Sequence, residues 1–138
     1  MATLLDTHAL VWLLEGSERL GPRSRDQIKA SAQADNLYVC AITPWEIAML
    51  VSKGRLSFNQ EVGQWLKSAL SMPGIRMVPL SVDIAVASTQ LPGDFHADPA
   101  DRMFVATAMN LAATLVTEDK LILAYSRAGH LKAQRAGA

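Results

Sequence analysis

The chain has little of what marks secreted or membrane-spanning proteins. Its single cysteine, Cys40, cannot form an internal disulfide, and it lies in the apolar run Tyr38-Val39-Cys40-Ala41-Ile42, so we expect it to be a small buried hydrophobic side chain. No apolar stretch approaches the roughly 18 residues that span a bilayer, and no basic segment precedes the first apolar residues. These absences favour a protein of the reducing cytoplasm.

An excess of charge of one sign is also missing. The 13 basic residues are balanced by 13 acidic residues among the 138 of the chain. Without a general cationic coat, any polyanion must be held by a local basic patch. Half of the residues are hydrophobic and 19% are charged, which is typical of an ordinary globular protein, and the length suits one domain.

Short apolar segments alternate with segments of helical periodicity, and no linker is long enough to divide the chain. We expect strands near residue 4 and at 37–42, 75–79 and 114–117, and helices at 7–15, 22–34, 44–53, 60–70, 81–89, 120–127 and from 99 onward. Thr43 is expected to cap the third helix. The alternation predicts an α/β fold with right-handed crossovers between parallel strands.

Four acidic residues each lie at the edge of an apolar segment. Asp6, Glu46 and Asp119 follow expected strands, Glu46 after the short turn Thr43-Pro44-Trp45, whereas Asp101 opens an apolar helix. In an open parallel sheet the ligand crevice lies outside the carboxyl ends of the strands, so acids distant in sequence can converge there. Carboxylates held close together repel one another, and a hard cation such as Mg²⁺ or Mn²⁺ compensates. The pattern therefore predicts a metal site.

Each acid also has a plainer interpretation. A single aspartate after a strand is most often a helix cap or turn former, so the metal-site interpretation of Asp6 depends on all four acids together. Asp98 immediately precedes Pro99, which suits the first position of a helix. We therefore expect Asp98 to cap that helix, with a place in the metal site as the alternative.

Seven segments match, in order and spacing, the motifs of a known family across nearly the whole chain. They are Leu4-Leu5-Asp6-Thr7-His8-Ala9-Leu10 with Trp12, Trp45-Glu46-Ile47-Ala48, Gly54-Arg55-Leu56, Leu91-Pro92, His96, Asp98-Pro99-Ala100-Asp101-Arg102 and Leu115-Val116-Thr117-Glu118-Asp119. The chain thus resembles a PIN-domain ribonuclease of the VapC toxin type. The resemblance implies a PIN-like three-layer α/β/α domain with a central parallel sheet of four to five strands. Only the end departs: the family often closes with a short extra strand, but residues 129–138 contain no apolar run. We expect one domain over residues 1–138, with 132–138 as a frayed tail.

The same resemblance implies metal-dependent hydrolysis of RNA phosphodiester bonds. The family's metal-binding acids correspond to Asp6, Glu46, Asp101 and Asp119. We expect Asp6 and Asp101 to bind Mg²⁺ or Mn²⁺ directly, whereas Glu46 and Asp119 act through water or complete a second ion site. Thr7 and Thr117 are expected to hold carboxylates by hydrogen bonds.

Partners are less clearly marked in the sequence. Lys53 and Arg55 could meet RNA phosphates, although cations at a helix end also suit the helix dipole. We interpret a second basic stretch as a solvated face, with the steering of RNA as the alternative; it consists of Arg19, Arg23, Arg25 and Lys29. We interpret His8 and His96 as structural hydrogen-bonded groups, with substrate contact as the alternative for His96. Arg102 is interpreted as a salt-bridge partner rather than a phosphate grip. Family resemblance implies a homodimer and a cognate VapB-type antitoxin whose peptide occludes the acids.

Other classes fit less well. A phosphorylation receiver would need a pair of acids after its first strand, and a haloacid-dehalogenase phosphatase would need a second aspartate two residues after Asp6, where His8 stands. The remaining alternative is a non-catalytic PIN-like module that binds RNA or antitoxin without cutting. A cluster of acids that repels phosphate argues against it.

Overall fold

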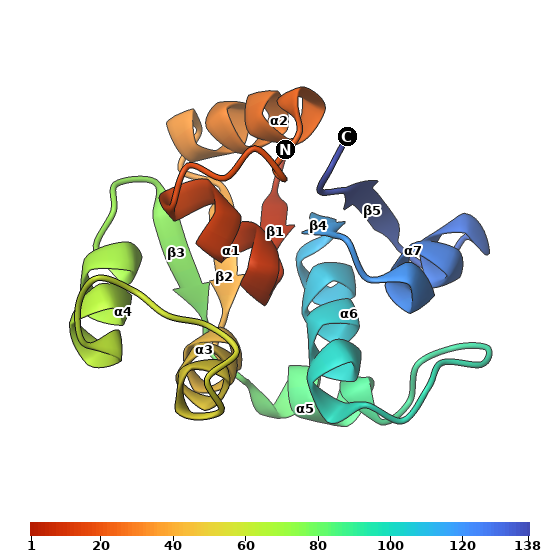
Figure 1. Ribbon diagram of the computed structural model, residues 1–138. Coiled ribbons are helices and arrows are strands. Elements are labelled where there is room, and N and C mark those ends of the chain that lie inside the picture. Colours follow the sequence, from red (N-terminus) through yellow and green to blue (C-terminus); the bar gives the residue numbers. More distant parts are fainter.

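The computed structural model describes all 138 residues and is built on a five-stranded parallel sheet (Figure 1). The strands are β1 Thr3–Leu5, β2 Leu37–Cys40, β3 Ile75–Val78, β4 Thr114–Thr117 and β5 Lys132–Arg135. They lie in the order β3-β2-β1-β4-β5, and every neighbouring pair is parallel. The carboxyl ends of all five strands therefore point toward one edge of the sheet, and β1 lies at its centre.

Seven helices complete the fold. They are α1 Thr7–Leu14, α2 Pro22–Gln33, α3 Thr43–Ser52, α4 Val62–Leu70, α5 Val82–Ser88, α6 Pro99–Leu111 and α7 Lys120–Arg127. Each expected helix and strand is present, with ends within about two residues of the expectation. None of the helices has the length and apolar character required to cross a membrane.

The sheet separates two hydrophobic clusters, which makes the three-layer architecture explicit. Side chains alternate between the faces of a strand, so Leu5 packs in a cluster with residues of α1 to α4, whereas Leu4 packs in the other cluster with residues of α6 and α7. Cys40 belongs to the second cluster and is buried, as expected. The α/β fold with a central parallel sheet is confirmed.

The prediction of a frayed tail over residues 132–138 is wrong. Residues 132–135 form β5, which pairs with β4 along its length, and Ala136 is fully buried. Glu118 accepts a hydrogen bond from the Gly137 amide at 2.8 Å, and the Ser24 amide donates to the Ala138 carbonyl at 3.1 Å. An edge strand is held by main-chain hydrogen bonds to one neighbouring strand, and the pattern of apolar side chains in a sequence does not reveal such bonds.

The expected cap of α3 is also wrong. Thr43 is the first residue of the helix, and Ile42 precedes it as a cap without a side-chain hydrogen bond. The Thr43 hydroxyl instead lies 3.3 Å from the hydroxyl of Thr7, buried between α1 and α3. The threonine therefore joins two helices at the edge of the sheet where the acids lie.

Candidate metal centre

A cleft of about 490 Å³ opens at the carboxyl ends of β1 and β4. Its walls include all four acids singled out in the sequence: Asp6, Glu46, Asp101 and Asp119. These side chains come from the end of β1, the first turn of α3, the first turn of α6 and the residue before α7. The convergence expected from strand ends and helix starts is present in the structure.

Asp6 is the most deeply placed of the acids. It caps α1, accepting a hydrogen bond from the Ala9 amide on Oδ1 at 2.8 Å, and its Oδ2 accepts one from the Thr117 hydroxyl at 2.6 Å. Burial raises the pKa of Asp6 to about 6, although both hydrogen bonds favour the charged form and oppose that rise. The carboxylate is thus fixed in orientation and reluctant to carry its charge without a compensating cation.

Glu46 faces Asp6 from the start of α3. Its Oε1 accepts a hydrogen bond of 2.5 Å from the hydroxyl of Thr7, which is the residue after Asp6. Burial raises the pKa of Glu46, and the Thr7 hydrogen bond works against the rise. The hydrogen bonds expected from Thr7 and Thr117 to site carboxylates are therefore both present.

Asp101 has the strongest electrostatic perturbation in the cleft. Its pKa is raised to about 7, first by burial and then by the negative charges of the acids around it, which are Asp119, Asp98, Glu46 and Asp6. A group whose charge is opposed by four neighbouring carboxylates marks a point of concentrated negative potential. A divalent cation placed there would relieve the repulsion.

Asp119 caps the last helix of the domain. Its Oδ1 accepts hydrogen bonds from the Leu121 and Ile122 amides, both at 2.9 Å, and its own amide donates to the Thr117 hydroxyl at 3.0 Å. Oδ1 is thus committed to the helix. The other oxygen makes no hydrogen bond, which leaves it free for a ligand in the cleft.

Asp98 is a cap, as its position before Pro99 predicts. Its Oδ1 accepts a hydrogen bond from the Asp101 amide at 3.0 Å. The side chain lines a neighbouring, more apolar hollow with Trp45, Pro99 and Met103 rather than the cleft of the four acids. Its charge nevertheless reaches the site, since it helps to raise the pKa of Asp101.

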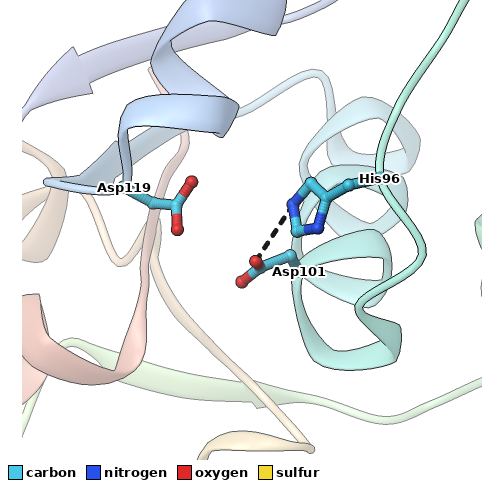
Figure 2. A group of neighbouring side chains, drawn as sticks. All are labelled: His96, Asp101 and Asp119. Carbon is cyan, nitrogen blue, oxygen red and sulfur yellow. Dashed lines mark ion pairs between the residues drawn. The ribbon is translucent and has the colours of Figure 1, made fainter.

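The two histidines depart from the expectation of hydrogen-bonded structural groups. His8 is exposed at the mouth of the cleft and makes no side-chain hydrogen bond. His96 turns toward the acids: its Nε2 lies 3.2 Å from Asp101 Oδ2, as Figure 2 shows. The contact is an ion pair if the imidazole is protonated, but the two atoms are not aligned for a hydrogen bond, and the buried Nε2 has no hydrogen-bond partner.

The only Lys or Arg side chain in the wall of the cleft is Arg19, which the sequence placed on a solvated face. Its guanidinium lies 5.7 Å from the ring centre of Trp12, a second residue of the wall. Arg19 belongs to the turn between α1 and α2, whose path the sequence does not reveal, and Trp12 belongs to α1. Lys53 and Arg55 lie exposed at the end of α3, outside the cleft wall.

Arg102 is not the salt-bridge partner that the sequence predicted. Its guanidinium donates to three backbone carbonyls, those of Ser88 at 2.7 Å, Phe95 at 2.9 Å and His96 at 3.1 Å. It therefore ties the loop before α6 to the end of α5. That loop carries His96, so Arg102 helps to fix the position of the imidazole beside Asp101.

Comparison with known proteins agrees with this geometry. The sequence profile of the PIN domain family matches residues 3–128. The chain belongs to the PIN domain family. This PIN domain is 33% identical over 117 residues to Ribonuclease VapC22 of Mycobacterium tuberculosis, covering 85% of the chain and 86% of that protein.

Solved structures share the PIN fold over nearly the full length. VapBC2 from Rickettsia felis, bound to a promoter DNA fragment, aligns with a TM-score of 0.70 at 18% identity, covering 97% of this chain and 98% of that one. A toxin-antitoxin complex from Klebsiella pneumoniae aligns with a TM-score of 0.63 at 21% identity, covering 98% of both chains. At these identities the likeness concerns the fold.

Proposed function

We propose that this PIN-domain protein is a divalent-metal-dependent endoribonuclease that hydrolyses RNA phosphodiester bonds. The observation that carries the proposal is the convergence of four carboxylates, from four separate elements, in one cleft. Like charges are gathered there at a cost, as the raised pKa of about 7 at Asp101 indicates. The relative with 33% identity is named a ribonuclease, which supports RNA as the substrate.

The residues fit a hard divalent cation, Mg²⁺ or Mn²⁺. Carboxylate oxygens are the ligands such ions favour, and a cation would offset the mutual repulsion of the acids. Asp6 and Asp101 would hold it directly, and Asp119 and Glu46 would complete the site directly or through water. When bound, such an ion lowers the pKa of a water molecule and neutralises charge on the phosphate.

The protein's own groups orient these acids and bind the substrate. Thr117 and the Ala9 amide fix Asp6, and Thr7 fixes Glu46, so the carboxylates are positioned before RNA arrives. Arg19 provides a cation in the wall of an acidic cleft, where it can meet a phosphate. Lys53 and Arg55 form a second phosphate contact further along the RNA.

We further propose that the protein is the toxin of a toxin-antitoxin pair in the cytoplasm. Structures of the same fold include VapBC2 from Rickettsia felis and FitAB bound to a DNA fragment. A cognate VapB-type antitoxin would cover the cleft, and the 138 residues would act as one domain in a homodimer. The exposed Trp45, 59% accessible beside the cleft, is the kind of aromatic that anchors such partners.

The test is cleavage of a defined RNA pool by purified protein freed of any antitoxin. Sequencing of RNA ends is compared in EDTA, Mg²⁺ and Mn²⁺ for the wild type, Asp6→Asn and Asp101→Asn. Asp83→Asn, an exposed acid of α5 outside the cleft, is the matched control. We expect new ends only with metal, from the wild type and the control. Tight RNA binding without new ends in either metal would instead favour the non-catalytic module.

A further inference from the structure

His96 lies beside the four-acid cleft and lines a neighbouring hollow with Phe95 and Tyr125, but its imidazole reaches Asp101. One ligand atom each of His96, Asp101 and Asp119 lies within 4.8 Å of the others, and the three side chains converge on a common space in Figure 2. The imidazole comes from the loop before α6, whereas the acids open α6 and α7. Three potential metal ligands thus meet from three segments.

The Nε2 atom is placed as a ligand rather than as a hydrogen-bond donor. It is buried, it has no hydrogen-bond partner, and it lies 3.2 Å from Asp101 Oδ2. Adjacent ligands of an octahedral ion at about 2.1 Å lie about 3 Å apart. Asp101 alone gives this atom an ion pair, and only if the imidazole is protonated, whereas a cation shared with the two acids would satisfy the neutral ring.

The surroundings of His96 hold the imidazole in this position. Arg102 donates hydrogen bonds to the carbonyls of both Phe95 and His96. The Phe95 ring lies 4.5 Å from the His96 ring and 4.8 Å from that of the buried Tyr125. The Tyr125 hydroxyl donates to the Pro92 carbonyl at the other end of the loop. Such support is what a ligand needs to be in place before the ion arrives.

We propose that His96 is a metal ligand of this site and gives it a preference for Mn²⁺ over Mg²⁺. The inference rests on the proposed metal-dependent function. Mg²⁺ takes oxygen ligands almost exclusively, whereas first-row transition metals accept imidazole nitrogen readily. One nitrogen among carboxylate oxygens therefore raises affinity for Mn²⁺ more than for Mg²⁺. An all-carboxylate site would not discriminate in this way.

The direct test is electron spin-echo spectroscopy of the Mn²⁺-loaded wild type, which detects nitrogen bound to the ion. We expect a nitrogen coupling that changes when the histidines carry ¹⁵N and that disappears in His96→Ala. His8→Ala is the matched control and should keep it, because His8 lines the four-acid cleft but lies outside the cluster. The ¹⁵N comparison needs only the wild type, so the test stands even if a variant folds poorly.

Affinities measured by Mn²⁺ paramagnetic resonance with Mg²⁺ as competitor give the second readout. His96→Ala should weaken Mn²⁺ binding by at least about 10-fold, the loss that follows even from removal of an outer-shell partner. Mg²⁺ binding should weaken much less, and His8→Ala should leave both affinities unchanged. Wild type that binds Mn²⁺ without nitrogen coupling, or an unchanged Mn²⁺/Mg²⁺ ratio in His96→Ala, overturns the role of His96 and leaves the four-acid site standing. Wild type that binds neither ion overturns the metal site and His96 with it.

Discussion

The Thr117 hydroxyl donates a hydrogen bond of 2.6 Å to Asp6 Oδ2 across 111 positions of the chain. The contact follows from strand register, since Leu5 pairs with Val116 and the next residues on β1 and β4 must face each other. The same hydroxyl accepts a hydrogen bond from the Asp119 amide at 3.0 Å. One threonine thus links two of the four acids.

Thr117→Val should shift the pH dependence of cleavage. The Thr117 hydrogen bond lowers the pKa of Asp6, so its removal raises that pKa above its value of about 6. The acid limb of the pH–rate profile should therefore move to higher pH. The variant should also lose about 1 to 3 kcal/mol of stability, because the Asp119 amide loses its acceptor. Thr114→Val, on the same strand and without a side-chain hydrogen bond, should leave the profile unchanged.

The metal-free protein should become less stable as pH rises. Asp6 and Asp101 have pKa values raised from an ordinary 3.8 to about 6 and about 7. A raised folded-state pKa contributes stability below the unfolded value, and this is lost as pH climbs through the folded value. The melting temperature in EDTA should therefore fall by several degrees between pH 5 and pH 8. Saturating Mn²⁺ at pH 8 should restore the lost stability.

Asp101→Asn is the decisive variant for that pH dependence. It removes the titrating charge, so its metal-free melting temperature should vary much less over the same range. Asp83→Asn should retain the full dependence of the wild type. An equal slope for Asp101→Asn and the wild type would mean that repulsion at the site does not govern stability.

The sequence predicted those parts of the fold that depend on local patterns. Apolar runs revealed the first four strands, and Pro99 with the preceding acid revealed the start of α6. The four acids could be grouped because parallel strands bring their carboxyl ends to one edge. The sequence did not predict β5, because this strand is held by main-chain hydrogen bonds and carries no apolar run.

Side-chain partners across the fold were harder to predict than the acids. The Arg19–Trp12 contact depends on the path of the turn after α1, and the three carbonyl acceptors of Arg102 depend on the path of two loops. The position of His96 follows from that loop in turn. Neither residue spacing nor charge pattern encodes such contacts, because they join segments whose relative placement is fixed only by packing.

Asp98 offers a test that separates capping from metal binding. Asn caps a helix about as well as Asp, so Asp98→Asn should keep stability and most activity, whereas Asp98→Ala should lose about 0.5 to 2 kcal/mol. Denaturant unfolding and cleavage rates check both variants. Asp94→Ala, an exposed acid of the preceding loop, is the control. Loss of activity in Asp98→Asn at unchanged stability would place Asp98 in the metal site.

Arg19→Ala should weaken RNA binding more than alanine substitution of a neighbouring basic residue does. A cation that contacts a phosphate releases a counterion, so its removal should reduce the slope of log affinity against log salt by about 0.7 for single-stranded RNA. Binding is best measured in Ca²⁺ or with Asp6→Asn as background, where no cleavage intervenes. Cleavage at saturating RNA should be less affected than affinity.

Two comparisons make the Arg19 result specific. Arg23→Ala changes an exposed cation of α2 outside the cleft wall, and we expect it to leave the salt slope unchanged. The double variant Lys53→Ala with Arg55→Ala should reduce the slope if the end of α3 also meets phosphate. Equal slopes for Arg19→Ala and the wild type, with the double variant reduced, would move the phosphate contact from the cleft wall to the end of α3. Because Arg19 is the one Lys or Arg side chain in that wall, we expect a reduced slope for Arg19→Ala as well as for the double variant.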